Sequence, residues 1–248
     1  DGHWQDEASW DPDRQRVRAE RQLKLGALVV RHTPQPSPAP ALCRTLLIEQ
    51  LKKSASLDAL PWTDSSHQLR QRLAWMHQQV GAPWPDRDLT TLLEQADTWL
   101  GPSLEGCLGW NDISVTVLEE ALWGDLNWSF RQQLDGLLPR RIPIPSGRQA
   151  ALLYTADEVI LAVKLQEMFG SDDGPHVLNG RIPITLELLS PAGRPLQRTR
   201  DLKGFWQGSY QEVRREMRGR YPKHPWPDDP REALPTSRTK RKSDEGRP

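Results

Sequence analysis

The sequence predicts an α+β protein in which N-terminal strands precede a central helical bundle and a β-rich C-terminal module with one helix and a flexible basic tail. Three observations support this fold class. Apolar residues recur at helical spacing through the middle of the chain, they alternate or form short runs towards both ends, and prolines separate these regions. The 248 residues are enough for one large domain or two ordinary ones.

Residues 1–33 are predicted to form strands. Three arginines alternate behind an Asp-Pro-Asp turn signal and would lie on one face of an extended segment: Arg14, Arg16 and Arg18. The apolar run Leu25–Val30 is typical of a buried strand. Four prolines between Thr33 and Pro40 then predict a semi-rigid linker, and therefore a domain boundary.

Residues 41–138 are predicted to form a helical region. Leu69, Leu73 and Met76 share one helical face behind a capping cluster that begins at Thr63. Two shorter helices are predicted at 112–123, with Asp112 as N-cap, and at 127–138. Most of the 11 tryptophans lie in or beside these stripes, which favours core packing over a binding role. Short loops between the helices indicate a compact antiparallel bundle.

Residues 139–230 are predicted to form a β-rich extension, followed by a disordered tail at 231–248. Strand-like runs on either side of turn signals predict two hairpins, formed by 151–154 with 159–163 and by 182–189 with 196–200. One helix is predicted at about 203–218. Proline-rich and then charged sequence follows it, which is typical of a chain end without a core.

The net charge of zero hides an asymmetry. Residues 1–193 carry 18 Lys and Arg against 25 Asp and Glu, a net charge of −7, whereas residues 194–248 carry 15 against 8, a net charge of +7. A basic end of this kind indicates contact with polyanions, although it could equally dock on an acidic partner or on the acidic remainder. No apolar run is long enough to cross a membrane, and two cysteines 64 positions apart favour a reducing compartment, the cytoplasm.

The motifs of common catalytic sites are absent from the sequence. There is no Gly-x-x-x-x-Gly-Lys-Ser/Thr loop, no Gly-x-Ser-x-Gly elbow, no His-Glu-x-x-His and no dinucleotide-binding glycine turn. The six histidines are scattered. We therefore expect this chain alone to be catalytically inactive and to hold no cofactor. A hydrolase with an unrecognised site is a further alternative, but no motif in the sequence marks a nucleophile together with its general base.

The basic segment near the C-terminus is the strongest functional signal. On the predicted helix, Trp206, Tyr210 and Met217 share an apolar face. The arginines of this helix lie on or beside the opposite face, where they could bind phosphate groups. Guanidinium groups beside exposed aromatic rings could hold a nucleic-acid backbone and stack its bases. The candidate residues are Arg14, Arg16, Arg18, Arg214, Arg215, Arg218, Arg220, Tyr221, Lys223, Trp226, Lys240, Arg241 and Lys242. In the alternative interpretation the arginines are merely solvated, the aromatic rings are core, and the Arg14–Arg18 strand is an edge strand protected by charge.

Several motifs together resemble one protein family. They are Leu60-Pro-Trp62, Ile144-Pro-Ser-Gly147, Val163-Lys-Leu-Gln-Glu-Met-Phe-Gly170, Leu189-Ser-Pro-Ala-Gly-Arg-Pro-Leu-Gln197, Asp201-Leu-x-Gly-Phe-Trp206 and Arg218-Gly-Arg-Tyr-Pro-Lys-His-Pro-Trp-Pro-Asp-Asp-Pro230. This set resembles the region behind the helicase core in the bacterial DEAH-box ATP-dependent RNA helicases of the HrpB type, over essentially the whole chain. Because the sequence begins at Asp1, it is expected to be a piece of a longer protein.

The resemblance implies a parent with two RecA-like ATPase lobes, followed by winged-helix, helical-bundle and OB-like domains and a family-specific C-terminal extension. Residues 1–33 would then belong to the OB-like part. ATP and Mg would be bound by the parent's core, and none of the core's motifs lies in this chain. From the positive charge near the C-terminus and the aromatic residues beside it, we hypothesise that the chain is an accessory region that binds the RNA backbone without reading sequence. The alternative is a protein-interaction or scaffolding module that packs on the helicase core and does not touch nucleic acid.

Overall fold

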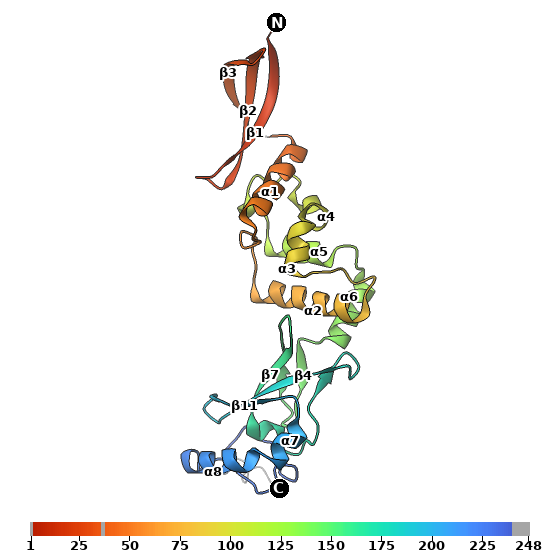
Figure 1. Cartoon of the computed structure of the whole chain (residues 1–248), viewed down its shortest axis with the longest axis vertical. Coiled ribbons are helices and arrows are strands. Elements are labelled where there is room, and N and C mark those ends of the chain that lie inside the picture. Colours follow the sequence, from red (N-terminus) through yellow and green to blue (C-terminus); the bar gives the residue numbers. More distant parts are fainter. Residues whose placement is uncertain (1, 36–37, 240–248) are drawn as a thin grey trace. The chain divides into compact units, whose positions relative to one another are not determined.

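The computed structural model describes residues 2–35 and 38–239, and it divides into two compact units, Asp1–Asn127 and Trp128–Pro248 (Figure 1). Each unit is described by itself. The predicted mixture of helices and strands is confirmed.

The first unit begins with an antiparallel sheet in the order β1-β2-β3, formed by His3–Asp11, Arg16–Leu25 and Leu28–Gln35. In β2, Val17 and Ala19 are buried and alternate with the exposed Arg16 and Arg18. Since side chains of a strand point to opposite faces in turn, one face of β2 is covered by protein and the other faces solvent at this end.

The predicted linker is shorter than expected. Thr33, Pro34 and Gln35 continue β3, and Pro40 is already the first residue of α1. β3 is an edge strand, where proline is tolerated because one side of the strand needs no ladder hydrogen bond. At the first position of a helix, proline removes only an N–H that has no intrahelical partner.

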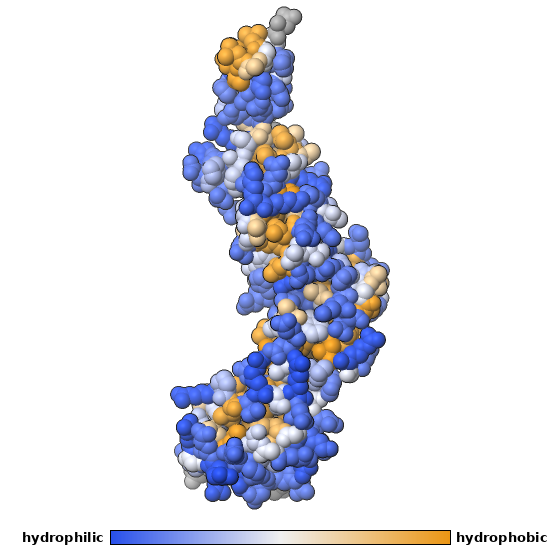
Figure 2. Space-filling model, in the orientation of Figure 1, coloured by the Kyte–Doolittle hydropathy of each residue, from blue (hydrophilic) through white to orange (hydrophobic). Residues whose placement is uncertain are grey.

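The prediction that Leu25–Val30 is a buried strand is wrong. Gly26 and Ala27 form the turn between β2 and β3, and the side chains around it face solvent. The exposed apolar residues of this sheet are Trp4, Leu25, Leu28 and Val30. Figure 2 shows a hydrophobic patch at the end of this sheet, where Leu25 and Leu28 are paired neighbours on β2 and β3. Short apolar runs do not by themselves distinguish a covered strand from an uncovered one.

The helices of the first unit pack around a leucine core. They are α1 (Pro40–Ser54), α2 (Asp64–Val80), α3 (Leu89–Glu94), α4 (Ala96–Trp99), the 3-10 helices η1 (Gly101–Leu104) and η2 (Trp110–Asp112), and α5 (Val115–Trp123). Leu47, Leu73 and Leu118 are completely buried. Trp75, Trp84, Trp99 and Trp110 are buried as predicted, whereas Trp128 in the second unit is 70% exposed.

The helix caps show which short-range signals were correct. Thr63 caps α2: its hydroxyl accepts from the Ser66 N–H, and the Ser66 hydroxyl accepts from the Thr63 N–H. The predicted cap at Asp112 is wrong, because Ser114 caps α5 instead. The Asp112 carboxylate accepts from the N–H groups of Leu108 and Gly109 and so closes the preceding turn.

Gly109 joins the sheet of the first unit to its helices. It forms a β-bridge with Arg16, and the Val17 N–H donates to the Leu108 carbonyl at 2.6 Å. A Cβ at Gly109 would lie 2.9 Å from the Gln15 carbonyl oxygen.

Gly109→Ala should therefore lower the stability of the first unit by about 1–2 kcal/mol through steric crowding and speed hydrogen exchange at the Val17 amide. Gly136→Ala, with open space around its Cβ, is the control. Unchanged exchange in Gly109→Ala would contradict this role.

The second unit combines α6 with a small mixed sheet. Its elements before the final helices are α6 (Trp128–Leu137), β4 (Arg141–Pro143), β5 (Gln149–Ala151), β6 (Leu153–Tyr154), β7 (Val159–Lys164), the 3-10 helix η3 (Leu165–Met168), β8 (His176–Val177), β9 (Ile182–Pro183), β10 (Thr185–Leu189) and β11 (Pro195–Thr199). The largest sheet has the order β11-β10-β7-β6, with β7 and β10 parallel. Both predicted hairpins are confirmed, as β6–β7 and β10–β11. Leu178 N–H donates to the Leu137 carbonyl, so α6 belongs with this unit.

The prediction of one helix at 203–218 is wrong, because the segment forms two helices, α7 (Leu202–Gln207) and α8 (Tyr210–Arg220). Gly208 separates them with a φ of −112° and a ψ of −97°, far from helical values. The break lets Trp206 and Tyr210 lie edge to face, with ring centroids 5.4 Å apart. Phe169 and Phe205 complete this aromatic core.

The described residues after Pro230, as far as Thr239, lie against the second unit. Gly170 N–H donates to the Pro230 carbonyl, and Thr236 N–H donates to the Gln166 carbonyl at 2.9 Å. This part of the predicted tail is therefore anchored. In the described part of the chain, no helix has the length and apolar character needed to cross a membrane.

Candidate nucleic-acid interface

Helix α8 carries most of the predicted contact residues and is fixed on its inner face. Tyr210 and Met217 are buried, and the Tyr210 hydroxyl donates to the Pro227 carbonyl at 2.8 Å. Burial raises the pKa of the Tyr210 phenol, which therefore stays protonated and keeps this hydrogen bond. The proline-rich segment after α8 thus runs back along the helix.

Arg214 stabilises this arrangement and is not a free cation. Its Nε donates to the Trp226 carbonyl at 2.8 Å, and its Nη2 lies 2.5 Å from Asp228 Oδ1. Its side chain is only 20% exposed. The candidate role of Arg214 in phosphate binding is therefore corrected to a structural one, because its donors are already directed at partners within the fold.

Arg215, Arg218 and Lys223 are exposed, and within residues 2–35 and 38–239 none of them has an ion-pair partner. The two arginines are three positions apart, so their side chains emerge from neighbouring positions on the outer face of α8. Arg220, also exposed, lies 3.2 Å from Glu216 in an i,i+4 pair. Such solvent-exposed pairs are weak and can exchange Glu216 for another anion.

The two aromatic candidates differ in exposure. Trp226 is 5% exposed, and its indole Nε1 donates to the Tyr221 carbonyl at 3.0 Å. The prediction that it is an exposed stacking platform is therefore wrong, since neither face of its ring is open to a base. Tyr221 is half-buried and meets His224 edge to face.

The N-terminal candidates lie in the other unit. Arg14 belongs to the turn between β1 and β2, where its N–H donates to Asp11, so it does not share a strand face with the others as predicted. Arg16 and Arg18 do alternate on the exposed face of β2, and Arg18 pairs with Glu20 at 3.1 Å. Lys240, Arg241 and Lys242 lie outside the described residues.

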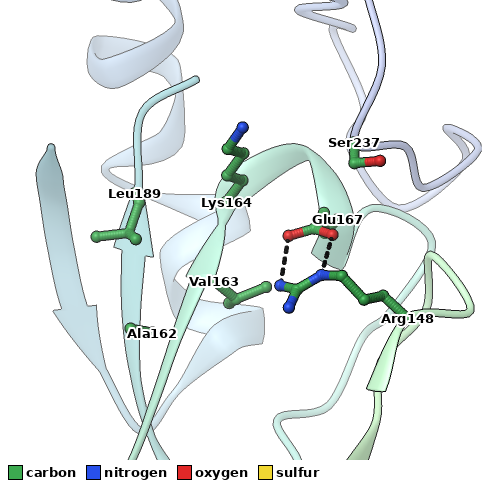
Figure 3. Close-up of a pocket in the computed structure, with 7 residues that line it drawn as sticks. All are labelled: Arg148, Ala162, Val163, Lys164, Glu167, Leu189 and Ser237. Atoms are coloured by element: carbon green, nitrogen blue, oxygen red, sulfur yellow. Dashed lines mark hydrogen bonds and ion pairs between the residues drawn. The ribbon is translucent and has the colours of Figure 1, made fainter. Parts of the chain in front are cut away.

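Sequence reasoning missed an ion pair with a buried carboxylate in the second unit, between Arg148 and Glu167. Glu167 in η3 is 2% exposed and accepts from Nε and Nη2 of Arg148 at 2.8 and 2.9 Å (Figure 3). Burial disfavours the charged carboxylate, but the Arg148 hydrogen bonds and charge, helped by Ser146, outweigh it and lower the pKa of Glu167. No local motif marks the pair, because its members are 19 positions apart and meet only through the topology.

Comparison with known proteins identifies the family to which the chain belongs. A family model described as ATP-dependent helicase C-terminal (HrpB_C) matches residues 99–230, more than half of the chain. The chain belongs to the HrpB family. A second model, the connector region of the ATP-dependent RNA helicase HrpB, matches residues 3–35. The resemblance inferred from the motifs is thereby confirmed.

The HrpB relatives are much longer than this chain. The ATP-dependent RNA helicase HrpB of Escherichia coli (strain K12) is 40% identical over 243 residues, which are 96% of this chain and 30% of the relative. A crystal structure of the E. coli DExH-box NTPase HrpB matches with a TM-score of 0.74 at 40% identity, over 96% of this chain and 30% of that one. A crystal structure of the Escherichia coli DEAH/RHA helicase HrpB matches with a TM-score of 0.63 at 37% identity, over 91% and 29%. The chain thus spans less than a third of the length of these HrpB proteins.

Proposed function

We propose that this chain is the non-catalytic C-terminal accessory region of an ATP-dependent RNA helicase and that it binds the RNA backbone without reading sequence. The observation that carries the proposal is the pair of exposed arginines on α8, Arg215 and Arg218, followed after the helix by the exposed Lys223; none of the three has an anionic partner in the described parts of the chain. Unpaired cations on a helix are suited to phosphates, whose contacts position a protein on nucleic acid but carry no sequence information.

ATP and Mg²⁺ belong to another part of the parent in this proposal. The residues present do not fit them: the sequence has no phosphate-binding glycine loop, and among residues 2–35 and 38–239 no group of three His, Cys, Asp or Glu side chains could hold a metal ion. We therefore derive no step of nucleotide hydrolysis for this chain. Its partners would be RNA and the helicase core of the parent, in the cytoplasm.

The OB-like assignment of residues 1–33 is part of the same proposal. The described residues form three antiparallel strands, whereas an OB barrel has five. The remaining strands would have to come from elsewhere in a longer chain.

The test is fluorescence anisotropy with a labelled single-stranded 12-nucleotide RNA. The double variant Arg215→Ala/Arg218→Ala should weaken binding about tenfold, from roughly 0.7 kcal/mol for each exposed contact. The slope of log K against log salt should become shallower by about 1.4, because about 0.7 is lost for each phosphate contact to a single strand.

The control carries the same charge change at two other exposed residues of the second unit, as Arg194→Ala/Lys203→Ala. It should change affinity by less than about twofold. An equal loss in both double variants, or none in either, would contradict a specific basic face on α8.

A second candidate function is a module that packs on the helicase core without touching nucleic acid. The observations that favour it are the exposed apolar patch, which includes Leu25 and Leu28, and the engagement of Arg214 within the fold. Uncovered apolar sheet faces mark interaction surfaces. Wild-type protein that fails to bind the 12-mer even at low salt would favour this candidate over the first.

A further inference from the structure

The chain makes a tight turn directly after α8, formed by the four residues from Tyr221 to His224. The Tyr221 N–H donates to the Met217 carbonyl at 2.8 Å, and the His224 N–H donates to the Tyr221 carbonyl at 3.1 Å. The second bond is that of a β-turn, and proline is favoured at the position that Pro222 occupies. Because both bonds join backbone groups, the turn does not depend on the side chains of its first and last residues.

The rings at the two ends of this turn lie together. Tyr221 and His224 meet edge to face, with ring centroids 6.3 Å apart and ring planes at 84°. Both residues are half-buried, whereas the other two tyrosines, Tyr154 and Tyr210, are 1% and 0% exposed. The turn therefore presents to solvent part of an aromatic pair whose two rings are fixed relative to each other.

Cations surround this aromatic pair along the chain. Lys223 lies between the two rings in sequence and is exposed, and Arg218 is exposed on the last turn of α8, three positions before Tyr221. Within residues 2–35 and 38–239, neither cation has an ion-pair partner. The positive charge beside the rings is therefore available to an anion from outside the chain.

The ring of His224 is uncharged at neutral pH. Burial, and to a lesser extent the positive charge of Lys164, lowers the pKa of His224 below its ordinary value of 6.5. A neutral imidazole is a flat aromatic surface and not a further cation. The turn thus combines two uncharged aromatic rings with a cation between them in sequence.

This combination favours an unpaired nucleotide as the ligand. Single-stranded nucleic acids are held by cations that contact the backbone and by aromatic side chains on which bases stack. An acidic peptide could contact the same cations, but its carboxylates would gain nothing from the rings. Stacking tolerates any base because every base has a π-face, so such a contact agrees with binding that does not read sequence.

We propose that the Tyr221–His224 pair stacks one unpaired base of RNA and that Lys223 contacts the adjoining phosphate. This inference rests on the proposed RNA binding and deepens it. It adds His224 to the candidate residues and separates a base contact from the phosphate contacts. Arg215 and Arg218, on the helix that leads into the turn, would hold further phosphates.

Anisotropy with the labelled 12-mer RNA separates the two kinds of contact in the full chain. Tyr221→Ala and His224→Ala should each weaken binding about fivefold, because a stacking partner is lost. The salt slope should not change in either variant, since no charge is removed. Lys223→Ala should instead make the slope shallower by about 0.7.

Three further variants serve as controls. Tyr221→Phe and His224→Phe keep a flat ring and should bind within about twofold of the wild type. His176→Ala removes an exposed histidine of β8 in the same unit and should also change affinity by less than about twofold. A shallower salt slope in Tyr221→Ala would contradict an uncharged base contact.

An abasic strand of the same length distinguishes stacking from a structural role of the rings. It keeps the phosphates but lacks the bases, so wild-type protein should bind it about fivefold more weakly than the 12-mer. Tyr221→Ala and His224→Ala should bind the two strands equally. A ring that only stabilises the fold would, when removed, weaken both complexes by the same factor and leave their ratio unchanged, which would overturn the proposal.

The stacking proposal and the proposed RNA binding fail in different ways. If Arg215→Ala/Arg218→Ala loses affinity but Tyr221→Ala and His224→Ala do not, the stacking assignment is wrong and RNA binding by α8 stands. The same conclusion follows if wild-type protein binds the abasic strand as tightly as the 12-mer. If wild-type protein does not bind the 12-mer at low salt, both proposals are wrong.

Discussion

Arg148→Ala is expected to lower the free energy of unfolding of the second unit by about 2–3 kcal/mol at pH 7. The variant leaves the Glu167 carboxylate buried without its cation, a situation that costs about 3–5 kcal/mol in fully buried pairs. We take a smaller value because the Arg148 side chain is 49% exposed, while that of Glu167 is 2% exposed. Urea unfolding of the full chain, followed by hydrogen exchange of β7 and η3, measures the loss.

The same variant should show a defined pH dependence. The pKa of Glu167 in the folded protein lies below its ordinary value of 4.5. A carboxylate with a lowered pKa contributes stability that is full above its ordinary value and is lost as the pH falls through the folded value. The deficit of Arg148→Ala should therefore be full above about pH 5 and shrink at lower pH.

Arg181→Ala removes an exposed arginine of the same unit and is the control. It should change stability by less than about 0.5 kcal/mol at either pH. A deficit of Arg148→Ala that is the same at pH 7 and pH 3 would show that the buried charge is not its cause.

Trp226→Ala is expected to cost about 3–5 kcal/mol of stability in the second unit, as large-to-small changes of buried aromatic residues do. The ring is 5% exposed and its Nε1 holds the Tyr221 carbonyl, while the backbone carbonyl of Trp226 accepts from Arg214. Trp226→Phe, which loses mainly the indole hydrogen bond, should cost about 1–2 kcal/mol. Urea unfolding measures both losses.

RNA affinity separates this structural role from base stacking. Under conditions where the Trp226→Phe variant is fully folded, its affinity for the 12-mer should equal that of the wild type, because Trp226 offers no open ring face. Tyr221→Ala, at the half-buried position, is the comparison variant. Normal stability of Trp226→Ala together with lost RNA binding would restore the stacking interpretation.

Elements set by short-range chemistry could be predicted from sequence. The hairpin β6–β7 follows from the strand-like runs on either side of Thr155–Glu158, and the start of α2 follows from the Thr63 cap. The length of the last helix could not be predicted in this way. Tyr210 continues the apolar spacing from Trp206, although Gly208 ends one helix between them. Periodicity alone therefore does not detect a break that tertiary contacts stabilise.

The candidate site likewise has features that the sequence predicted and features that depend on tertiary contacts. Clustered arginines correctly marked α8 as basic, but neighbouring residues of identical type have different roles. Arg214 is held by Trp226 and Asp228, whereas Arg215, the next residue, faces solvent. The return of the proline-rich segment along the helix makes this difference, and no spacing rule contains it.

By itself, the sequence determined the family, the presence of both helices and strands, and the concentration of positive charge near the C-terminus. Only the tertiary structure decided which charges are neutralised and which rings are covered. The two clearest examples are the apolar end of the N-terminal sheet, which is exposed, and the ion pair between Arg148 and Glu167. The physical reason is that burial and ion pairing depend on segments that are distant along the chain, whereas helix caps and turns depend on neighbours within a few residues.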